Sequence, residues 1–253
     1  MIPYVRRKKI IEYLENQEIV YIVDLAKYAK TSEATIRRDL KLLEEEGRIE
    51  MLQGGAAKLV EHEREKSLNE RMNFKKEEKS KLGSYAATLV SQGEFIFIGP
   101  GTTENWMLKH LVGKGVTVVT NGIFHIEKLM NFDIDLILIG GKVNKADRLV
   151  SCETSTEQIK KMNFDKCFLG GLGISEEKGV STSSSSLASF NKEVMNRSEK
   201  SILLVDSTKF EKKARYKFAD VDDFNTILCI GDVYSDFEQR DNVTKIGSTG
   251  ETY

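Results

Sequence analysis

The stretch TSEATIRRDLKLLEEEG, at residues 31–47, decides how the first part of the chain folds. Three apolar residues recur in it at intervals of four and three positions: Ile36, Leu40 and Leu43. This spacing predicts a helix over residues 33–46 with one apolar stripe facing a small core. Ser32 can cap the helix, because its side-chain oxygen can accept from the first unpaired amides, and Gly47 ends it.

The opposite face of this helix carries side chains that can reach another molecule. At about 100° per residue, Ala34, Arg38 and Lys41 lie opposite the apolar stripe, with Thr35 and Arg37 on its flanks. Arginines on such a face can contact phosphates or guanine edges in a major groove. Considered alone, a cationic helix face is more often solvated surface than a binding site. The interpretation therefore depends on the neighbouring elements.

Those neighbours complete a winged helix-turn-helix. A helical segment, a short β-prone stretch and a second helical segment precede the turn, at residues 5–16, 19–23 and 24–29. The turn at residues 30–32 joins two short helices, an arrangement that lets the second helix lie in a major groove. Residues 48–53 and the Gly54-Gly55 pair predict a β-hairpin wing.

The composition is that of an ordinary globular protein. Of its 253 residues, 40% are hydrophobic and 30% charged, and the net charge is −1. This balance gives no argument for a nucleic-acid partner, so that argument rests on local cations. Because no signal peptide is recognisable at the start and no apolar run approaches about 20 residues, we expect a cytoplasmic protein that does not enter a membrane.

A charged segment separates two predicted domains. Residues 58–81 are dense in charges of both signs, which is typical of a solvated connector leading into a helix. We therefore expect a DNA-binding domain at residues 1–58, a linker at 59–75 and a larger domain at 76–253.

Short apolar runs alternate with helical segments in the larger domain. They lie at residues 95–98, 116–120, 136–139, 166–169 and 201–205. Such alternation predicts the α/β class with a largely parallel sheet. Ligands of open α/β sheets bind at the carboxyl ends of the strands, where glycine-rich or hydroxyl-bearing turns follow these runs.

The turn GPGTT at residues 99–103 is the first candidate for an anion site. Its glycines let backbone amides approach a phosphate, Thr102 and Thr103 add hydroxyl donors, and a predicted helix at 104–111 begins there. By itself the turn is weak evidence, because about half of such turns only satisfy loop geometry. A dianionic phosphate also needs cations, and three lie at strand ends or in the following loops: Lys142, Arg148 and Lys209.

Residues 31–40, with Gly47 and Gly54-Gly55-Ala56, are similar to the signature of DeoR-family repressors. The resemblance implies that residues 21–41 form a helix-turn-helix that binds operator DNA. The predicted DNA-contacting residues are Ser32, Thr35, Arg37, Arg38 and Lys41.

Two features depart from the family pattern or constrain the interface. Glu50 and Gln53 stand where the family commonly has a basic residue and a histidine, which argues against a phosphate contact from the wing. The acidic residues 44–46 must point away from the duplex, because a carboxylate repels phosphate.

The larger domain resembles the sugar-phosphate sensor domain of the same family, which implies the Rossmann-like fold of phosphosugar isomerases. Many members have an aspartate at the position of Gly99, and the GPGTT form is similar to repressors of lactose phosphotransferase operons, whose inducer is tagatose 6-phosphate. The candidate effector-binding residues are Gly99, Gly101, Thr102, Thr103, Asn121, Gly141, Lys142, Arg148 and Lys209.

Three functions remain open: a DNA-binding repressor released by a phosphorylated sugar, a phosphosugar isomerase with an accessory domain, and a module for protein contacts. The first is favoured, because an isomerase needs a tuned base and no motif assigns one. The histidines and cysteines lack metal-ligand spacing, so no metal or cofactor is predicted: His62, His110, His125, Cys152, Cys167 and Cys229. A helix-turn-helix usually reads repeated half-sites, so we expect a homodimer or homotetramer.

Overall fold

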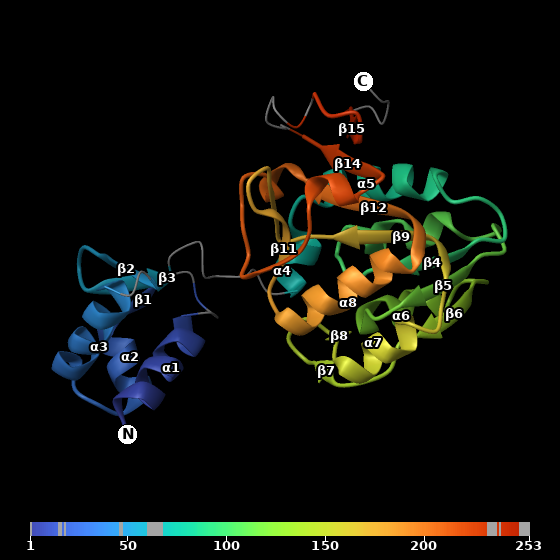
Figure 1. Ribbon diagram of the computed structural model, residues 1–253. Helices are drawn as coiled ribbons and strands as arrows, with labels where there is room; N and C mark the ends of the chain where they lie inside the picture. Colours follow the sequence, from blue (N-terminus) through green and yellow to red (C-terminus); the bar gives the residue numbers. More distant parts are fainter. Residues whose placement is uncertain are drawn as a thin grey trace. The chain divides into compact units, whose positions relative to one another are not determined.

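The computed structural model describes residues 2–14, 17, 19–45, 48–59, 68–231, 237 and 239–247. The chain divides into two compact units, Met1–Lys66 and Ser67–Tyr253 (Figure 1). Gly47, the predicted helix stop, lies outside the described residues, as do residues 60–67 of the predicted connector.

The first unit is a winged helix-turn-helix. Its elements in chain order are α1 (Pro3–Leu14), β1 (Val20–Tyr21), α2 (Ile22–Ala29), α3 (Glu33–Glu45), β2 (Ile49–Leu52) and β3 (Ala56–Leu59). Strands β2 and β3 form the predicted antiparallel hairpin, and β1 pairs with the other edge of β3. Gly54 and Gly55 turn the hairpin with φ values of 86° and 78°, which a residue without a Cβ adopts at little cost.

The stripe on α3 forms the centre of a small core. Ile36, Leu40 and Leu43 are fully buried and pack with apolar residues of α1 and α2. The β-prone stretch at residues 19–23 is a strand only over Val20–Tyr21, and α2 begins at Ile22. The helix therefore starts two residues before the predicted segment at 24–29, and its first residue, Ile22, is buried in this core.

The second unit is built on a seven-stranded sheet in which all neighbouring strands are parallel. In spatial order the strands are β15 (Val243–Ile246), β14 (Thr226–Ile230), β12 (Ser198–Asp206), β9 (Phe164–Gly170), β4 (Phe95–Ile98), β5 (Thr117–Thr120) and β6 (Asp135–Leu138). Each of the five predicted apolar runs overlaps one of these strands, with Val116 and Ile139 just outside β5 and β6. The predicted Rossmann-like α/β fold is therefore confirmed.

Helices cover both faces of this sheet (Figure 1). They are α4 (Leu68–Asn73), α5 (Lys76–Thr88), α6 (Ile123–Leu129), α7 (Glu153–Ile159) and α8 (Ser185–Asn196). Successive residues of a strand point to opposite faces, so Ile96 packs with Leu82 of α5 while Phe97 packs with Phe190 of α8. Both faces are thus buried at the centre of the sheet, as parallel sheets require, whereas the edge strand β6 is mostly exposed.

Smaller elements lie outside the main sheet. Strands β10 (Gly173–Ser175), β11 (Gly179–Thr182) and β13 (Tyr216–Ala219) form one antiparallel sheet, and β7 (Val143–Asn144) pairs with β8 (Leu149–Val150). Among the described residues, no helix is both long enough and apolar enough to cross a membrane.

The helix predicted at residues 104–111 is wrong in type. The segment forms two three-residue 3₁₀ turns, η1 (Glu104–Trp106) and η2 (Leu108–His110), closed by bonds such as Met107 N to Glu104 O at 3.0 Å. A Cβ on Gly83 of α5 would lie 2.8 Å from Met107 N, so the segment packs very closely against that helix. The GPGTT turn therefore lacks the α-helix N-terminus that was expected to favour a phosphate there.

Candidate DNA-contacting helix and effector site

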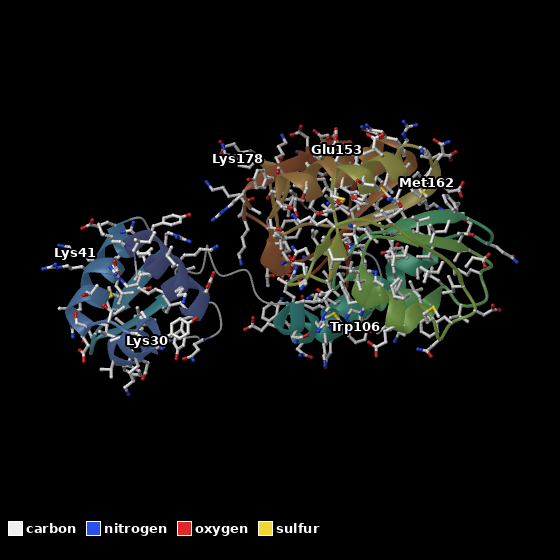
Figure 2. The ribbon with its side chains drawn as sticks, turned by 90° about the horizontal axis from the view of Figure 1, so that it is seen from below. Lys30, Lys41, Trp106, Glu153, Met162 and Lys178 are labelled. Atoms are coloured by element: carbon white, nitrogen blue, oxygen red, sulfur yellow. The ribbon has the colours of Figure 1, made fainter. Side chains whose placement is uncertain are left out.

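Helix α3 presents the predicted DNA-contacting cations to solvent. Arg37, Arg38 and Lys41 are exposed, and Figure 2 shows Lys41 pointing outward from the helix. Arg37 lies 4.0 Å from Glu33 on the same helix. Within the described part of the chain, the side chains of Arg38 and Lys41 make no hydrogen bond or ion pair, so both are available to a partner.

The start of α3 is held by its predicted cap. The Ser32 hydroxyl accepts from the Thr35 amide at 3.3 Å and shares a hydrogen bond of 2.9 Å with the Thr35 hydroxyl. Both predicted contact residues therefore also fix the N-terminal turn of the helix.

A buried carboxylate lies within this cationic helix and was not singled out from the sequence. Asp39 is 3% exposed, and Arg6 of α1 donates to it from Nε and, at 3.1 Å, from Nη2. The hydrogen bond to Asp39 raises the pKa of Arg6. The sequence held a signal for the burial of this side chain, because position 39 lies beside the apolar stripe of the helix. A buried carboxylate requires a partner, which Arg6 supplies.

The acidic side chains near the wing are engaged within the unit. Glu44 accepts from the Met51 amide at 2.9 Å, and Glu50 pairs with Lys58 across the hairpin at 2.9 Å. Lys58 therefore offsets part of the charge of Glu50 on this exposed hairpin.

In the second unit, the GPGTT turn follows β4 at its carboxyl end. Thr102 and Thr103 are 8% and 7% exposed, and the Thr102 hydroxyl accepts from Lys79 Nζ at 3.0 Å. Lys79, on α5, is 3% exposed and also donates to the Arg71 carbonyl at 2.6 Å. Burial lowers the pKa of Lys79 to about 8.

Further charges surround Lys79 from three elements. Arg71 lies on α4, Asp206 ends β12, and Lys209 ends the 3₁₀ turn η3 (Ser207–Lys209). All three affect the pKa of Lys79 through their charges, and Arg71 also pairs with Asp147. The Nε of Arg71 is buried with no hydrogen-bond partner among the described residues.

Glu104, the first residue of η1, is the most unusual group at this turn. It is 1% exposed, and burial raises its pKa to about 7, while Lys79, Lys209 and Arg71 oppose that rise. In the part of the chain that the structure describes, its Oε1 has no hydrogen-bond partner. A Cβ on Gly101 would lie 1.8 Å from Glu104 Oε2, so the carboxyl packs directly on the turn.

The remaining candidates divide into two groups. Asn121, at the end of β5, is fully buried and donates from Nδ2 to the Val150 carbonyl at 2.8 Å. Gly141, Lys142 and Arg148 lie in the exposed segment after β6. The side chains of Lys142 and Arg148 make no hydrogen bond or ion pair with any described residue, so no such bond links them to the Lys79–Thr102 pair.

His125 is a buried packing residue beneath the same turn. Its Nε2 donates to the Gly101 carbonyl at 3.3 Å, and its Nδ1 lies 3.3 Å from the Thr120 hydroxyl. Burial lowers its pKa to about 4, so His125 is neutral at physiological pH.

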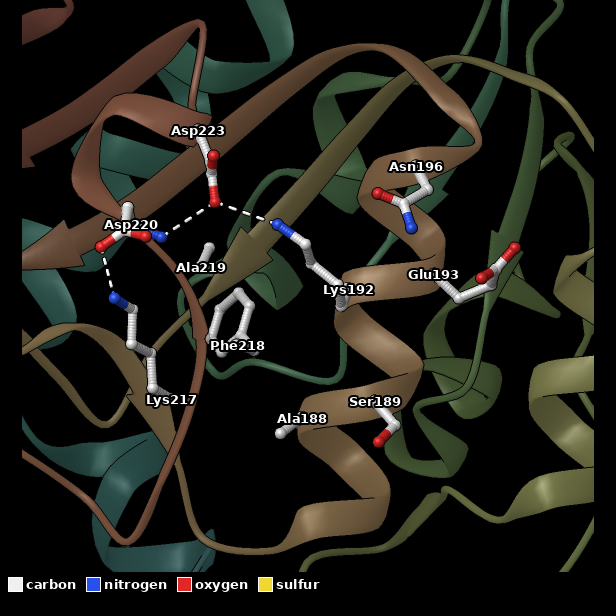
Figure 3. Close-up of a pocket in the computed structure, with 10 residues that line it drawn as sticks. All are labelled: Ala188, Ser189, Lys192, Glu193, Asn196, Lys217, Phe218, Ala219, Asp220 and Asp223. Carbon is white, nitrogen blue, oxygen red and sulfur yellow. Dashed lines mark hydrogen bonds and ion pairs between the residues drawn. The ribbon is translucent and has the colours of Figure 1, made fainter.

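An open pocket of about 550 Å³ lies elsewhere, between α8 and β13 (Figure 3). Lys192 bonds to Asp223 at 3.0 Å across it, and Lys217 pairs with Asp220. These charges satisfy one another, and none of the candidate effector-binding residues lines the pocket. It therefore gives no support for an effector site.

Sequence reasoning missed Arg71, Lys79 and Glu104. Arg71 and Lys79 lie in the segment that the sequence predicts as a solvated connector leading into a helix, and Glu104 begins the helix predicted at residues 104–111. A local signal existed for Lys79, because residues 79, 82 and 86 share one helix face and the other two are apolar.

Two protein-family profiles match the chain: the DeoR-like helix-turn-helix domain at residues 6–61 and the DeoR C terminal sensor domain at residues 75–229. The chain is 32% identical over 223 residues to the uncharacterized HTH-type transcriptional regulator FruR of Bacillus subtilis, covering 88% of this chain and 89% of that protein. It is 31% identical over 211 residues to the HTH-type transcriptional regulator GolR of Listeria innocua, covering 83% of each.

It is 27% identical over 220 residues to the HTH-type transcriptional repressor GlcR of Bacillus subtilis, covering 87% of this chain and 85% of that protein. A ribose 5-phosphate isomerase from Methanocaldococcus jannaschii aligns with 52% of this chain and 53% of its own, at 18% identity and a TM-score of 0.38. That likeness is too weak to bear on activity. The two profiles and the relatives favour the repressor interpretation over the isomerase, and the chain belongs to the DeoR family of DNA-binding transcriptional regulators, which are not enzymes.

Proposed function

We propose that this regulator represses a carbohydrate-utilisation operon and is released from its operator by a phosphorylated sugar. The observation that carries the effector class is the buried Lys79 ammonium on the Thr102 hydroxyl, with Arg71 and Lys209 close enough to affect its pKa. Three cations around a glycine- and threonine-bearing turn suit a dianionic phosphate, which forms strong charge-assisted hydrogen bonds.

Lys79 retains bonding capacity for such a ligand. An ammonium has three N–H donors, and two of them are used by the Arg71 carbonyl and the Thr102 hydroxyl. Thr103, the backbone at Gly101 and Asn121 Oδ1 would supply further groups at the carboxyl ends of β4 and β5. The Gly99 amide already donates to the Phe168 carbonyl at 2.8 Å, so Gly99 would contribute space rather than a donor. Gly141, Lys142 and Arg148 would join the ligand from the segment after β6.

Tagatose 6-phosphate is the sugar we propose, on the similarity of the GPGTT turn to that of lactose phosphotransferase repressors. The sensor domain would extend over residues 76–253, joined by the linker at 59–75 to an operator-binding domain at 1–58. The regulator would act in the cytoplasm as a homodimer or homotetramer on repeated half-sites.

Operator contacts are proposed for α3. Arg37, Arg38 and Lys41 extend from its exposed face, and Ser32 and Thr35 lie at its start. Glu44 and Glu50 are bonded to Met51 and Lys58 within the unit. The face with Arg37, Arg38 and Lys41 is therefore the surface whose charge suits a duplex.

Fluorescence anisotropy with the DNA upstream of the chain's own gene tests this function. We expect sequence-selective binding that weakens steeply as salt rises and is relieved by one sugar phosphate of a panel that includes tagatose 6-phosphate. Binding that no phosphorylated sugar affects would contradict the effector class. A lack of DNA binding at every salt concentration would contradict the operator assignment.

A further inference from the structure

The turn proposed to hold a phosphate is already filled by a side chain of the protein. The Glu104 carboxyl lies against three glycines at the ends of β4 and β9. A Cβ on Gly101 would lie 1.8 Å from its Oε2, one on Gly170 would lie 2.7 Å from its Oε1, and one on Gly99 would lie 3.6 Å from Oε1. These glycines therefore leave room for a carboxyl group.

The groups that stabilise the charged carboxyl here are a backbone hydrogen bond from its own residue and the nearby cations. Its Oε1 makes no hydrogen bond to the residues that the structure describes, and it is almost completely removed from solvent. The charged groups facing it are Lys79 of α5, Arg71 of α4 and Lys209 of η3. The same three cations are those proposed above to attract the effector's phosphate.

We propose that Glu104 is an internal competitor of the effector: its carboxyl occupies the glycine turn in the unliganded protein and must leave, or take up a proton, before a phosphate group enters. This inference rests on the proposed function, since it concerns the same site. Two anions at close range in a buried setting repel each other strongly, so a charged Glu104 and a phosphate cannot share the turn.

Competition by Glu104 would make the sensor selective for phosphorylated sugars over inorganic anions. Inorganic phosphate or sulfate offers only one anionic group to displace Glu104. A phosphorylated sugar adds hydroxyl groups, and two buried oxygens near the turn, Asn105 Oδ1 and Asn121 Oδ1, have no hydrogen-bond partner among the described residues. These acceptors would favour a ligand that carries hydroxyl donors.

Protonation weakens the competitor. The pKa of Glu104 is about 7, so the carboxyl is charged above that pH and neutral below it. Anion affinity should therefore rise as pH falls through about 7. Lys79, with a pKa of about 8, gains charge over part of the same range and contributes a trend of the same sign. The comparison between wild type and Glu104→Gln isolates the part due to Glu104, because Lys79 is present in both.

Sulfate is the suitable probe, because it stays a dianion, whereas a phosphate ester has a second pKa of about 6. Its binding to the full chain can be measured by calorimetry at about pH 6 and pH 8, on either side of the Glu104 pKa. Trp106, the single tryptophan, lies in η1 with Glu104 and gives an independent fluorescence readout. The matched control is Glu127→Gln, which removes an exposed carboxylate from α6.

We expect Glu104→Gln to bind sulfate about tenfold or more tightly than wild type at pH 8, with a smaller difference at pH 6 and no effect of Glu127→Gln. Should Glu104→Gln not fold, Glu104→Ala and the wild-type pH series test the same point. Equal sulfate affinity of wild type and variant at both pH values, with phosphorylated sugars still binding, would overturn the competitor role alone. If neither protein binds sulfate or any phosphorylated sugar, the proposed effector class fails as well.

Discussion

Arg6 on α1 donates from Nη2 to Oδ1 of Asp39, in the middle of α3, at 3.1 Å. Asp39 is almost fully buried, so the pair neutralises a carboxylate inside the helix that presents Arg37, Arg38 and Lys41. It also fixes α1 against α3. The contact therefore contributes to both the stability and the charge of the helix proposed to read DNA.

Removing one partner of this pair should destabilise the first unit. We expect Arg6→Ala to lower its free energy of unfolding by about 1–3 kcal/mol, because Asp39 is left buried and unpaired. The double variant Arg6→Ala/Asp39→Ala should lose less than the sum of the two single losses. Differential scanning calorimetry measures each value, and additive losses would show that the pair is not coupled.

Arg38→Ala should weaken operator binding without changing the fold. Its side chain is exposed and makes no hydrogen bond or ion pair with the described residues, so little stability depends on it. If Arg38 contacts a phosphate, the slope of log affinity against log salt should fall by about 1. Lys161→Ala, which removes an exposed charge from the second unit, is the matched control. Unchanged affinity of Arg38→Ala would contradict its assignment to the operator surface.

The apolar pattern of the sequence was enough to locate the main elements. Buried strands such as β4 are continuous apolar runs, and the α3 stripe has one helical period, so both could be recognised locally. Arg71 and Glu104 could not be assigned in the same way, and Lys79 only by its place on the apolar face of α5. Their burial depends on how α4, α5 and η1 pack together, and a charged residue is ordinarily expected at the surface.

The 3₁₀ turns after β4 show the same limit. The sequence at residues 104–111 has no helix breaker, and its apolar spacing fits an α-helix as well as two tighter turns. In the structure the 3₁₀ turns pack closely on Gly83 of α5. This contact joins residues far apart in the sequence, so the local sequence pattern could not predict it.

Glu104→Gln should change how stability depends on pH. The pKa of Glu104 is about 7 when folded and 4.5 ordinarily, so between these values the unfolded chain has lost a proton that the folded protein keeps. Its contribution to the free energy of unfolding therefore falls as pH rises from about 4.5 to 7. His125, with a pKa of about 4 rather than 6.5, contributes the opposite slope from about pH 4 to 6.5.

Relative to wild type, Glu104→Gln should become more stable as pH rises from 4.5 to about 7, by up to about 3 kcal/mol. Urea unfolding followed by Trp106 fluorescence reports the second unit specifically, since the chain has one tryptophan. A constant difference between the two proteins across this range would contradict the raised pKa.

A methyl group at Gly101 should collide with the Glu104 carboxyl, because the added Cβ would lie 1.8 Å from Oε2. We expect Gly101→Ala to destabilise the second unit by about 1–3 kcal/mol, as overpacking does. Glu104→Ala should relieve the loss in a double variant. If the cost of Gly101→Ala is the same with and without Glu104, the carboxyl does not occupy the turn.

The central claim is that a phosphate bound near Lys79 controls operator binding by α3. Its most direct test is the anisotropy of operator-bound wild type and Lys79→Met while the releasing sugar phosphate is titrated. The account predicts that Lys79→Met binds the operator like wild type and needs about 10- to 100-fold more sugar phosphate for release, because a charge-assisted hydrogen bond is lost. Release of both proteins at the same concentration would contradict it.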